Sequence, residues 1–122
     1  MAKLAIIAHG GAGADPRKKS NVEKAIQQGS SLLESDACAV DAAVEACVIL
    51  ENDPAFNAGT GSVTRLDGSV LVDASIHVSD GRLGFVASMP ETPNPIRVAE
   101  ALLDEEINCL LYTSPSPRDL DL

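Results

Sequence analysis

The chain has 122 residues, of which 45% are hydrophobic and 22% charged, and its formal net charge is −9. This length accommodates one small domain, and the composition excludes intrinsic disorder and a fibrous repeat. The negative charge and the lack of a clustered basic face argue against a nucleic-acid partner. The sequence has no apolar run near the roughly 20 residues of a membrane span and no signal-peptide pattern, so we expect a cytoplasmic protein without membrane contact.

The first part of the chain predicts one strand and two helices. Lys3–Ala8 is a compact apolar run before a glycine-rich segment, which predicts a buried strand followed by a flexible loop. Apolar residues at helical spacing predict a first helix over residues 20–33, with Ser20 and Glu23 as its capping box. A second helix follows residues 35–36 and ends near 52–54, where a proline stops it.

The middle of the chain predicts a meander of short strands. Two hairpins are predicted. In the first, the turn Asp67-Gly68 joins strands at 62–66 and 69–75, and in the second, the turn Asp80-Gly81 joins strands at 76–79 and 82–88. Asn94-Pro95 then opens a third helix as N-cap and first turn. Helices and strands that occur in blocks favour an α+β fold over a Rossmann-like alternation.

The cysteines and the end of the chain predict no chemistry. Cys38, Cys47 and Cys109 are odd in number and lack a metal-type spacing, so we expect them to be buried small hydrophobic residues. Residues 109–119 show no hydrophobic periodicity and resemble the in-frame translation of a sequencing-library adapter. We interpret 109–122 as adapter read-through and 1–108 as the domain; the alternative is a natural proline-rich terminus.

Two glycine-rich segments are the most specific features. They are Ala8-His9-Gly10-Gly11-Ala12-Gly13 and, after the second predicted helix, Phe56-Asn57-Ala58-Gly59-Thr60-Gly61-Ser62. With Asp73-Ala74-Ser75-Ile76 and Asn94-Pro95-Ile96, they resemble in order and spacing the α-subunit of plant-type L-asparaginases and isoaspartyl peptidases. The resemblance covers roughly residues 4 to 107. It implies that the chain is the truncated N-terminal part of the αββα sandwich of Ntn hydrolases.

The resemblance also implies a reaction, the hydrolysis of L-asparagine to aspartate and ammonia or of β-aspartyl dipeptides. Such enzymes cut themselves before a threonine, whose new α-amine, with a pKa of about 7.7 to 8.0, activates its own hydroxyl. Thr60 lies inside the second glycine-rich segment, and no threonine here has the Gly-Thr-Val-Gly context of a cleavage site. We therefore expect the nucleophile to lie on a separate β-subunit, in an (αβ)2 dimer, and this chain alone to be inactive.

Supporting roles follow from the resemblance for four residues of this chain. Asn57 would lie beside the nucleophile and orient it, because an amide both donates and accepts hydrogen bonds. His9, Gly10 and Gly11 would form a mobile loop that rearranges during self-cleavage. Residue type alone leaves other interpretations open, namely an asparagine that caps its own turn and a hydrogen-bonded histidine.

The resemblance implies a structural sodium ion and no catalytic cofactor. The ion would be wrapped by main-chain carbonyl groups, which suit a hard cation and would rigidify a glycine-rich loop. Mapped by position, these carbonyl groups belong to Leu50, Glu51, Asp53, Phe56, Ala58 and Thr60. The alternative is an ordinary loop fixed by the packing of Pro54 and Phe56.

Three other functions compete with this interpretation. A glycosylasparaginase-like amidohydrolase would share the fold and mechanism, and a noncatalytic α+β binding or structural module would need no nucleophile. A lipase-like hydrolase would need a Gly-x-Ser-x-Gly motif, which the sequence lacks. His77 stands where the plant-type pattern commonly has methionine, which leaves the preferred substrate open, and we expect it to be a strand residue and not a ligand.

Overall fold

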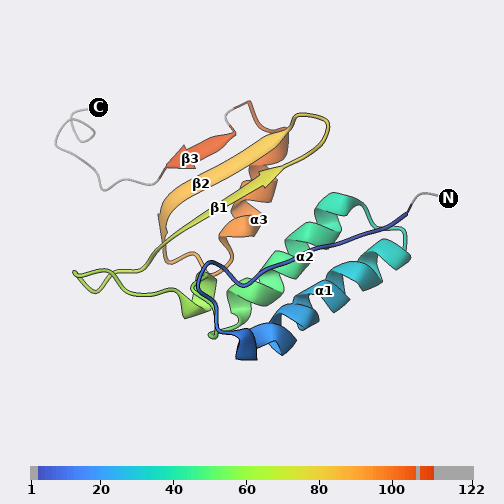
Figure 1. The fold of residues 1–122 in the computed structure, drawn as a ribbon. Helices are drawn as coiled ribbons and strands as arrows, with labels where there is room; N and C mark the ends of the chain where they lie inside the picture. Colours follow the sequence, from blue (N-terminus) through green and yellow to red (C-terminus); the bar gives the residue numbers. More distant parts are fainter. Residues whose placement is uncertain (1–2, 107, 112–122) are drawn as a thin grey trace.

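The computed structural model describes residues 3–106 and 108–111, and it shows an α+β fold of helices packed on a small sheet (Figure 1). The helices are α1 (Lys19–Glu34), α2 (Ala39–Asn52) and α3 (Pro95–Ala101), and the strands are β1 (Leu71–His77), β2 (Leu83–Pro90) and β3 (Cys109–Leu111). Short 3-10 turns lie at Pro16–Lys18, Gly59–Gly61 and Leu102–Asp104.

The sheet has the order β1-β2-β3, with β1 antiparallel and β3 parallel to the central strand β2. The hairpin of β1 and β2 turns at Asp80-Gly81, as the sequence predicts, and Asp80 Oδ1 accepts a hydrogen bond from Arg82 N at 3.0 Å. The register shifts between Val72 and Ala74, which forms an irregularity of the β-bulge type. His77 is the exposed last residue of β1, which confirms its prediction as a strand residue.

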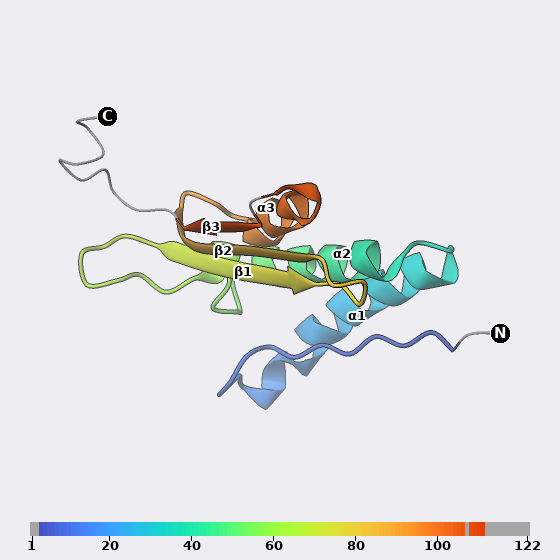
Figure 2. The same ribbon diagram turned by 90° about the horizontal axis from the view of Figure 1, so that it is seen from above.

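The core lies between one face of the sheet and the two helices α2 and α3, which Figure 2 shows on the same side of β1 and β2. Its buried members are Val44, Val48, Val86, Ile96 and Ala99. On its other side α2 packs against α1, where small residues allow the two helices to approach closely: the position of a Cβ on Gly29 lies 3.6 Å from the Cβ of Ala46. The helix α2 is therefore covered on two faces, and it ends at Asn52 as predicted.

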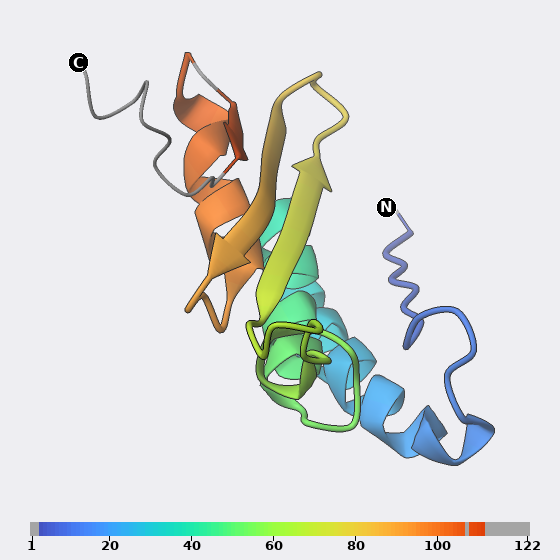
Figure 3. The same ribbon diagram turned by 90° about the vertical axis from the view of Figure 1, so that its left-hand side faces the viewer.

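The predicted buried strand at Lys3–Ala8 is wrong. These residues are extended but form no strand, and Ile7 is 94% exposed. Figure 3 shows this N-terminal segment, in dark blue, apart from the three strands. A strand needs a neighbour for its backbone hydrogen bonds, and within the described residues none lies beside it. The segment instead rests on the helices, where Leu4, Ile6, Ile26 and Leu33 line one shallow pocket.

Two further local predictions are wrong. Ser20 does not cap α1, because the chain already turns at Pro16–Lys18, where Asp15 Oδ1 accepts a hydrogen bond from Arg17 N at 2.8 Å. Residues 62–66 form no strand, although the turn at Asp67-Gly68 closes with a hydrogen bond from Arg65 N to the Ser69 carbonyl oxygen at 2.8 Å. A turn signal fixes only the local bend, whereas a strand also requires a long-range partner.

The cysteine prediction holds in part. Cys47 is half-buried beside the core, but Cys38 and Cys109 are exposed, so these two are not buried hydrophobic residues. Cys109 lies in β3, and the backbone of that strand pairs with β2 from Phe85 to Ala87. The remainder of the predicted read-through tail, residues 112–122, lies outside the described residues, and its interpretation stays a prediction.

Candidate functional site

The candidate site is built around the loop 53–62, which connects α2 to the segment before β1 and contains the second glycine-rich motif. A pocket of about 150 Å³ lies at this loop. Its lining combines the first glycine-rich motif with residues from the end of α2 and the loop: His9, Gly10, Gly11, Leu50, Phe56, Asn57 and Ala58. The four residues with predicted supporting roles thus meet at one place, although more than 40 positions separate His9 from Asn57.

Gly10 and Phe56 hold the two motifs together. The Phe56 side chain is buried, with 4% of its surface exposed, and it is packed against the N-terminal segment. A Cβ on residue 10 would lie 2.6 Å from Phe56 Cε1, which is closer than real side-chain contacts allow. Only glycine fits at position 10 with this ring in place.

His9 and Asn57 both use a side-chain atom to fix nearby backbone. His9 Nδ1 accepts a hydrogen bond from Gly11 N at 3.0 Å, and Asn57 Oδ1 accepts one from Val63 N at 3.0 Å. Both residues are exposed. The Asn57 contact spans the loop from its middle to its exit, so this residue does cap its own loop while it lines the pocket.

The threonines lie away from this pocket. Thr60 is exposed in the 3-10 turn and lines a separate pocket of about 600 Å³ with Met89 and Pro93. Thr92 Oγ1 donates a hydrogen bond to the Pro90 carbonyl oxygen at 2.7 Å, so it serves its own turn, and Thr64 is exposed in the loop before β1. None of these three threonines lines the pocket that His9 and Asn57 share.

The start of α1 also anchors the loop. Asp53 Oδ2 accepts a hydrogen bond from Asn21 Nδ2 at 2.7 Å, and Asp53 Oδ1 accepts one from Ala55 N at 2.9 Å. Both hydrogen bonds stabilise the carboxylate and hold the pKa of Asp53 below its ordinary value, and the bond from the Ala55 amide has the larger effect. Lys18 Nζ donates to the Ala55 carbonyl oxygen. The loop is therefore fixed at its beginning by two polar side chains of the first helical region.

A buried carboxylate anchors the same region to α3. Glu51 is 6% exposed, and its Oε2 accepts a hydrogen bond from Ile96 N at 3.1 Å, while its Oε1 accepts one from Asn94 Nδ2 at 3.3 Å. Burial raises the pKa of Glu51, and the two hydrogen bonds and the charge of Arg97 oppose that shift. Sequence reasoning selected Glu51 for its carbonyl group only, because a contact 45 positions along the chain leaves no local signal.

The carbonyl groups predicted for sodium lie in a tightly folded stretch of backbone. Those of Leu50, Asp53 and Ala58 accept backbone hydrogen bonds from Asp53, Phe56 and Gly61, at 3.0 to 3.3 Å. A Cβ on Gly61 would be 2.7 Å from the Pro54 carbonyl oxygen, and one on Gly59 would be 2.5 Å from that of Glu51. Glycine is therefore required at positions 59 and 61 by the close packing of the backbone. Three of the six predicted carbonyl groups already accept hydrogen bonds within the loop, and the sodium site stays a prediction. A cluster of three or more His, Cys, Asp or Glu side chains is not found within residues 3–106 and 108–111.

Comparison with known proteins shows to which family the chain belongs. The family model described as asparaginase matches residues 2–117, almost the whole chain. The chain belongs to the asparaginase family. It is 36% identical over 117 residues to the isoaspartyl peptidase/L-asparaginase of Rattus norvegicus, and this match covers 88% of the chain and 34% of the rat protein.

Two other relatives of this asparaginase-family chain give the same result. It is 38% identical over 116 residues to the isoaspartyl peptidase/L-asparaginase of Homo sapiens, with 87% of the chain and 37% of the human protein covered. It is 39% identical over 115 residues to the plant-type L-asparaginase of Pyrococcus abyssi, with 88% and 37% covered. The chain thus spans about a third of the length of these relatives. Within its described residues, no helix is both long and apolar enough to cross a membrane.

Proposed function

We propose that this chain is the N-terminal part of a threonine-dependent amidohydrolase that releases ammonia from L-asparagine, hydrolyses β-aspartyl dipeptides, or does both. The observation that carries this proposal is the pocket where His9, Gly10 and Gly11 meet Asn57, because it joins the two motifs that the resemblance rests on. The names of the relatives, isoaspartyl peptidase/L-asparaginase and plant-type L-asparaginase, support the same substrate class.

The reaction requires an activated nucleophile, and the chain's described threonines do not supply one. A hydroxyl nucleophile needs a base within hydrogen-bond reach, and in this enzyme class that base is the threonine's own α-amine. Thr60 is an internal residue of a 3-10 turn and lies outside the pocket of His9 and Asn57. In this proposal the nucleophile begins a separate β-subunit that is released by self-cleavage and completes an αββα sandwich, and two such pairs form the (αβ)2 enzyme.

The chain's own residues then position the reacting groups. The oxygen of the Asn57 carboxamide accepts the hydrogen bond from Val63 N, which leaves its amide NH2 as the donor that would orient the nucleophile. His9 shapes the Gly10-Gly11 backbone through its bond to Gly11 N, so this segment can change conformation as one unit when the precursor is cut.

A structural sodium ion belongs to the same proposal. The carbonyl groups of Leu50, Glu51, Asp53, Phe56, Ala58 and Thr60 would hold it, and when bound it would supply only positive charge that fixes the loop. The assignment rests on the resemblance; in the structure, the carbonyl oxygens of Glu51 and Phe56 lie against the backbone of Gly59 and Gly61. The chemistry on the substrate does not involve this ion.

The proposal is tested by the release of aspartate from L-asparagine and from a β-aspartyl dipeptide by the complete protein; the second product is ammonia in the first reaction and the free amino acid in the second. Asn57→Ala should lower kcat about 100-fold, because the nucleophile would lose the amide that orients it. Asn108→Ala is the matched control, because this exposed asparagine does not line the pocket, and its kcat should equal that of the unchanged protein. An Asn57→Ala variant with unchanged kcat, or a complete protein that releases aspartate from neither substrate, would refute the proposed function.

A further inference from the structure

The side chain of Glu51 has no role in the proposed function, which uses only its carbonyl group, yet it is the buried charged side chain of the described fold. Taking a carboxylate out of water is costly unless hydrogen bonds compensate for the lost hydration. Here two donors compensate, Ile96 N at 3.1 Å and Asn94 Nδ2 at 3.3 Å. Residues of this kind persist where they hold two segments in one arrangement, and the segments here are the end of α2 and the start of α3.

The start of α3 depends on this carboxylate. Asn94 occupies the N-cap position, but its side chain makes no capping hydrogen bond. Its Nδ2 instead donates to Glu51 Oε1 and, at 2.9 Å, to Asn52 Oδ1. Ile96 N, one of the backbone donors that a helix leaves unpaired at its start, is satisfied by Glu51 Oε2. A side chain of α2 thus caps α3, in place of a residue next to α3.

The loop that carries Asn57 passes close to this junction between α2 and α3. Gly59 has φ +48°, and a Cβ there would collide with the carbonyl oxygens of both Glu51 and Pro93. The loop backbone therefore passes through a gap between the end of α2 and the residues before α3. Asn57 lies two positions earlier, and it lines a polar pocket of about 220 Å³ together with Glu51, Gly59 and Pro95. The width of this gap decides where the loop, and Asn57 with it, can lie.

We propose that Glu51 is a positioning residue, whose carboxylate joins α2 to the start of α3 and so holds the loop of Asn57 in one geometry. Glu51 itself touches no reacting group. Its effect on turnover rests on the proposed function, whereas its effect on the loop does not.

An exchange of the two partners tests this inference in the complete protein. Glu51→Leu removes both acceptors and leaves Ile96 N and Asn94 Nδ2 without Glu51, and Asn94→Asp places two carboxylates against each other. The double variant combines Glu51→Gln with Asn94→Asp, and its glutamine can still accept from Ile96 N. In the double variant, the new amide at position 51 can donate to the new carboxylate at position 94, and Asn52 can turn its amide to donate as well. We expect each single variant to lower kcat about tenfold with unchanged KM, and the double variant to recover most of it. Glu34→Gln, an exposed change at the end of α1, is the control and should have no effect.

Hydrogen exchange of the same variants is independent of activity. Each single variant should exchange the amides of residues 57–62 and 94–97 several times faster than the unchanged protein, and the double variant should restore slow exchange. A double variant as impaired as the singles, or single variants with unchanged exchange and kcat, would overturn the inference. If Glu51→Leu does not fold, the double variant decides: a folded double variant supports the exchange, and an unfolded one contradicts it. If the unchanged protein releases aspartate from neither substrate, the proposed function fails, and the exchange data alone decide the inference.

Discussion

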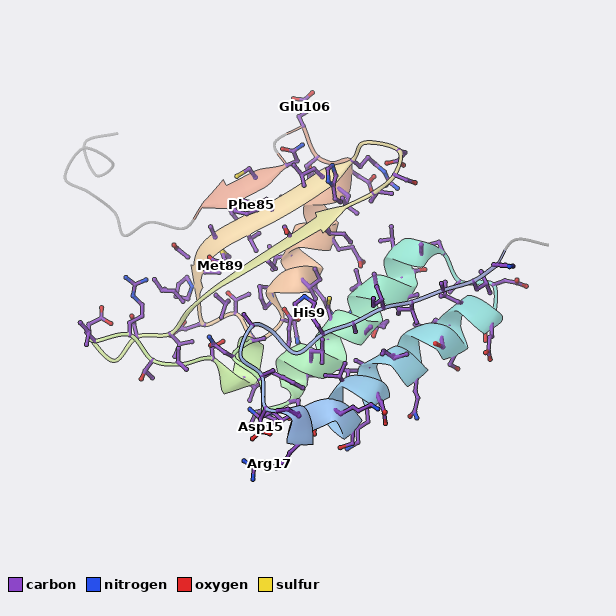
Figure 4. The ribbon with its side chains drawn as sticks, in the orientation of Figure 1. His9, Asp15, Arg17, Phe85, Met89 and Glu106 are labelled. Carbon is purple, nitrogen blue, oxygen red and sulfur yellow. The ribbon has the colours of Figure 1, made fainter. Side chains whose placement is uncertain are left out.

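Gly10 lies so close to the ring of Phe56 that a Cβ on residue 10 would fall 2.6 Å from Cε1. This contact joins the N-terminal segment, which otherwise has few buried residues, to the loop 53–62. It explains why the two glycine-rich motifs line one pocket although they are far apart in the sequence. Figure 4 labels His9 in the bend of this segment next to Gly10.

The first prediction concerns this contact. Gly10→Ala should displace the N-terminal segment from Phe56 and lower the kcat of the complete protein about tenfold or more, because displacements near 1 Å at a catalytic site are costly. Steady-state ammonia release measures this effect. Adding Phe56→Leu, which removes the clashing ring atoms, should restore part of the activity. A Gly10→Ala variant with full activity would show that the contact does not position the site.

The second prediction concerns the core under the sheet. Val86 is a fully buried residue of β2 that faces the helices. Val86→Ala should lower the free energy of unfolding by about 2 kcal/mol, because it removes two buried methyl groups and leaves a cavity. Val63→Ala removes the same atoms at a position that is 67% exposed and should change it by less than about 0.5 kcal/mol. Denaturant unfolding compares the two variants, and equal shifts would contradict the described core.

The third prediction concerns thiol reactivity. Burial, and after it the nearby charge of Glu51, raises the pKa of the Cys47 thiol, so less reactive thiolate forms there at neutral pH. Cys38 is exposed. Iodoacetamide at pH 7.5 should therefore alkylate Cys38 at least about tenfold faster than Cys47, as followed by peptide mass spectrometry. The Cys47 rate should rise as the pH is raised toward its elevated pKa. Equal rates at the two cysteines would contradict the burial of Cys47.

The fourth prediction concerns the sodium ion. The complete protein should melt at a higher temperature in sodium chloride than in tetramethylammonium chloride at the same ionic strength, since an ion that binds only the folded state stabilises it. Gly61→Ala would push a methyl group toward the Pro54 carbonyl oxygen and should abolish this difference. Equal melting temperatures of the unchanged protein in the two salts would contradict a sodium site.

Local sequence signals predicted the elements that local physics decides. The helix α2 has its apolar faces and its terminating proline within one stretch of sequence, and the hairpin of β1 and β2 has its turn at Asp80-Gly81. Lys3–Ala8 and residues 62–66 have strand-like composition but no strand in the described structure, because their pairing depends on partners that no local pattern specifies.

The candidate site shows the same division. His9 and Asn57 were found through the motifs around them, and the pocket confirms that they lie together but not what they do. The side chain of Glu51 was missed, because its partners Asn94 and Ile96 are 43 and 45 positions away. The anchoring of the loop by Lys18 and Asn21 was missed for the same reason.

The central claim is that this chain supplies the scaffold of an amidohydrolase whose nucleophile is a threonine freed by self-cleavage. Intact-mass measurement and N-terminal sequencing of the purified complete protein test it most directly. The account predicts two chains, one of which contains His9 and Asn57 while the other begins with threonine. A single uncut chain that nevertheless releases ammonia from L-asparagine would contradict it.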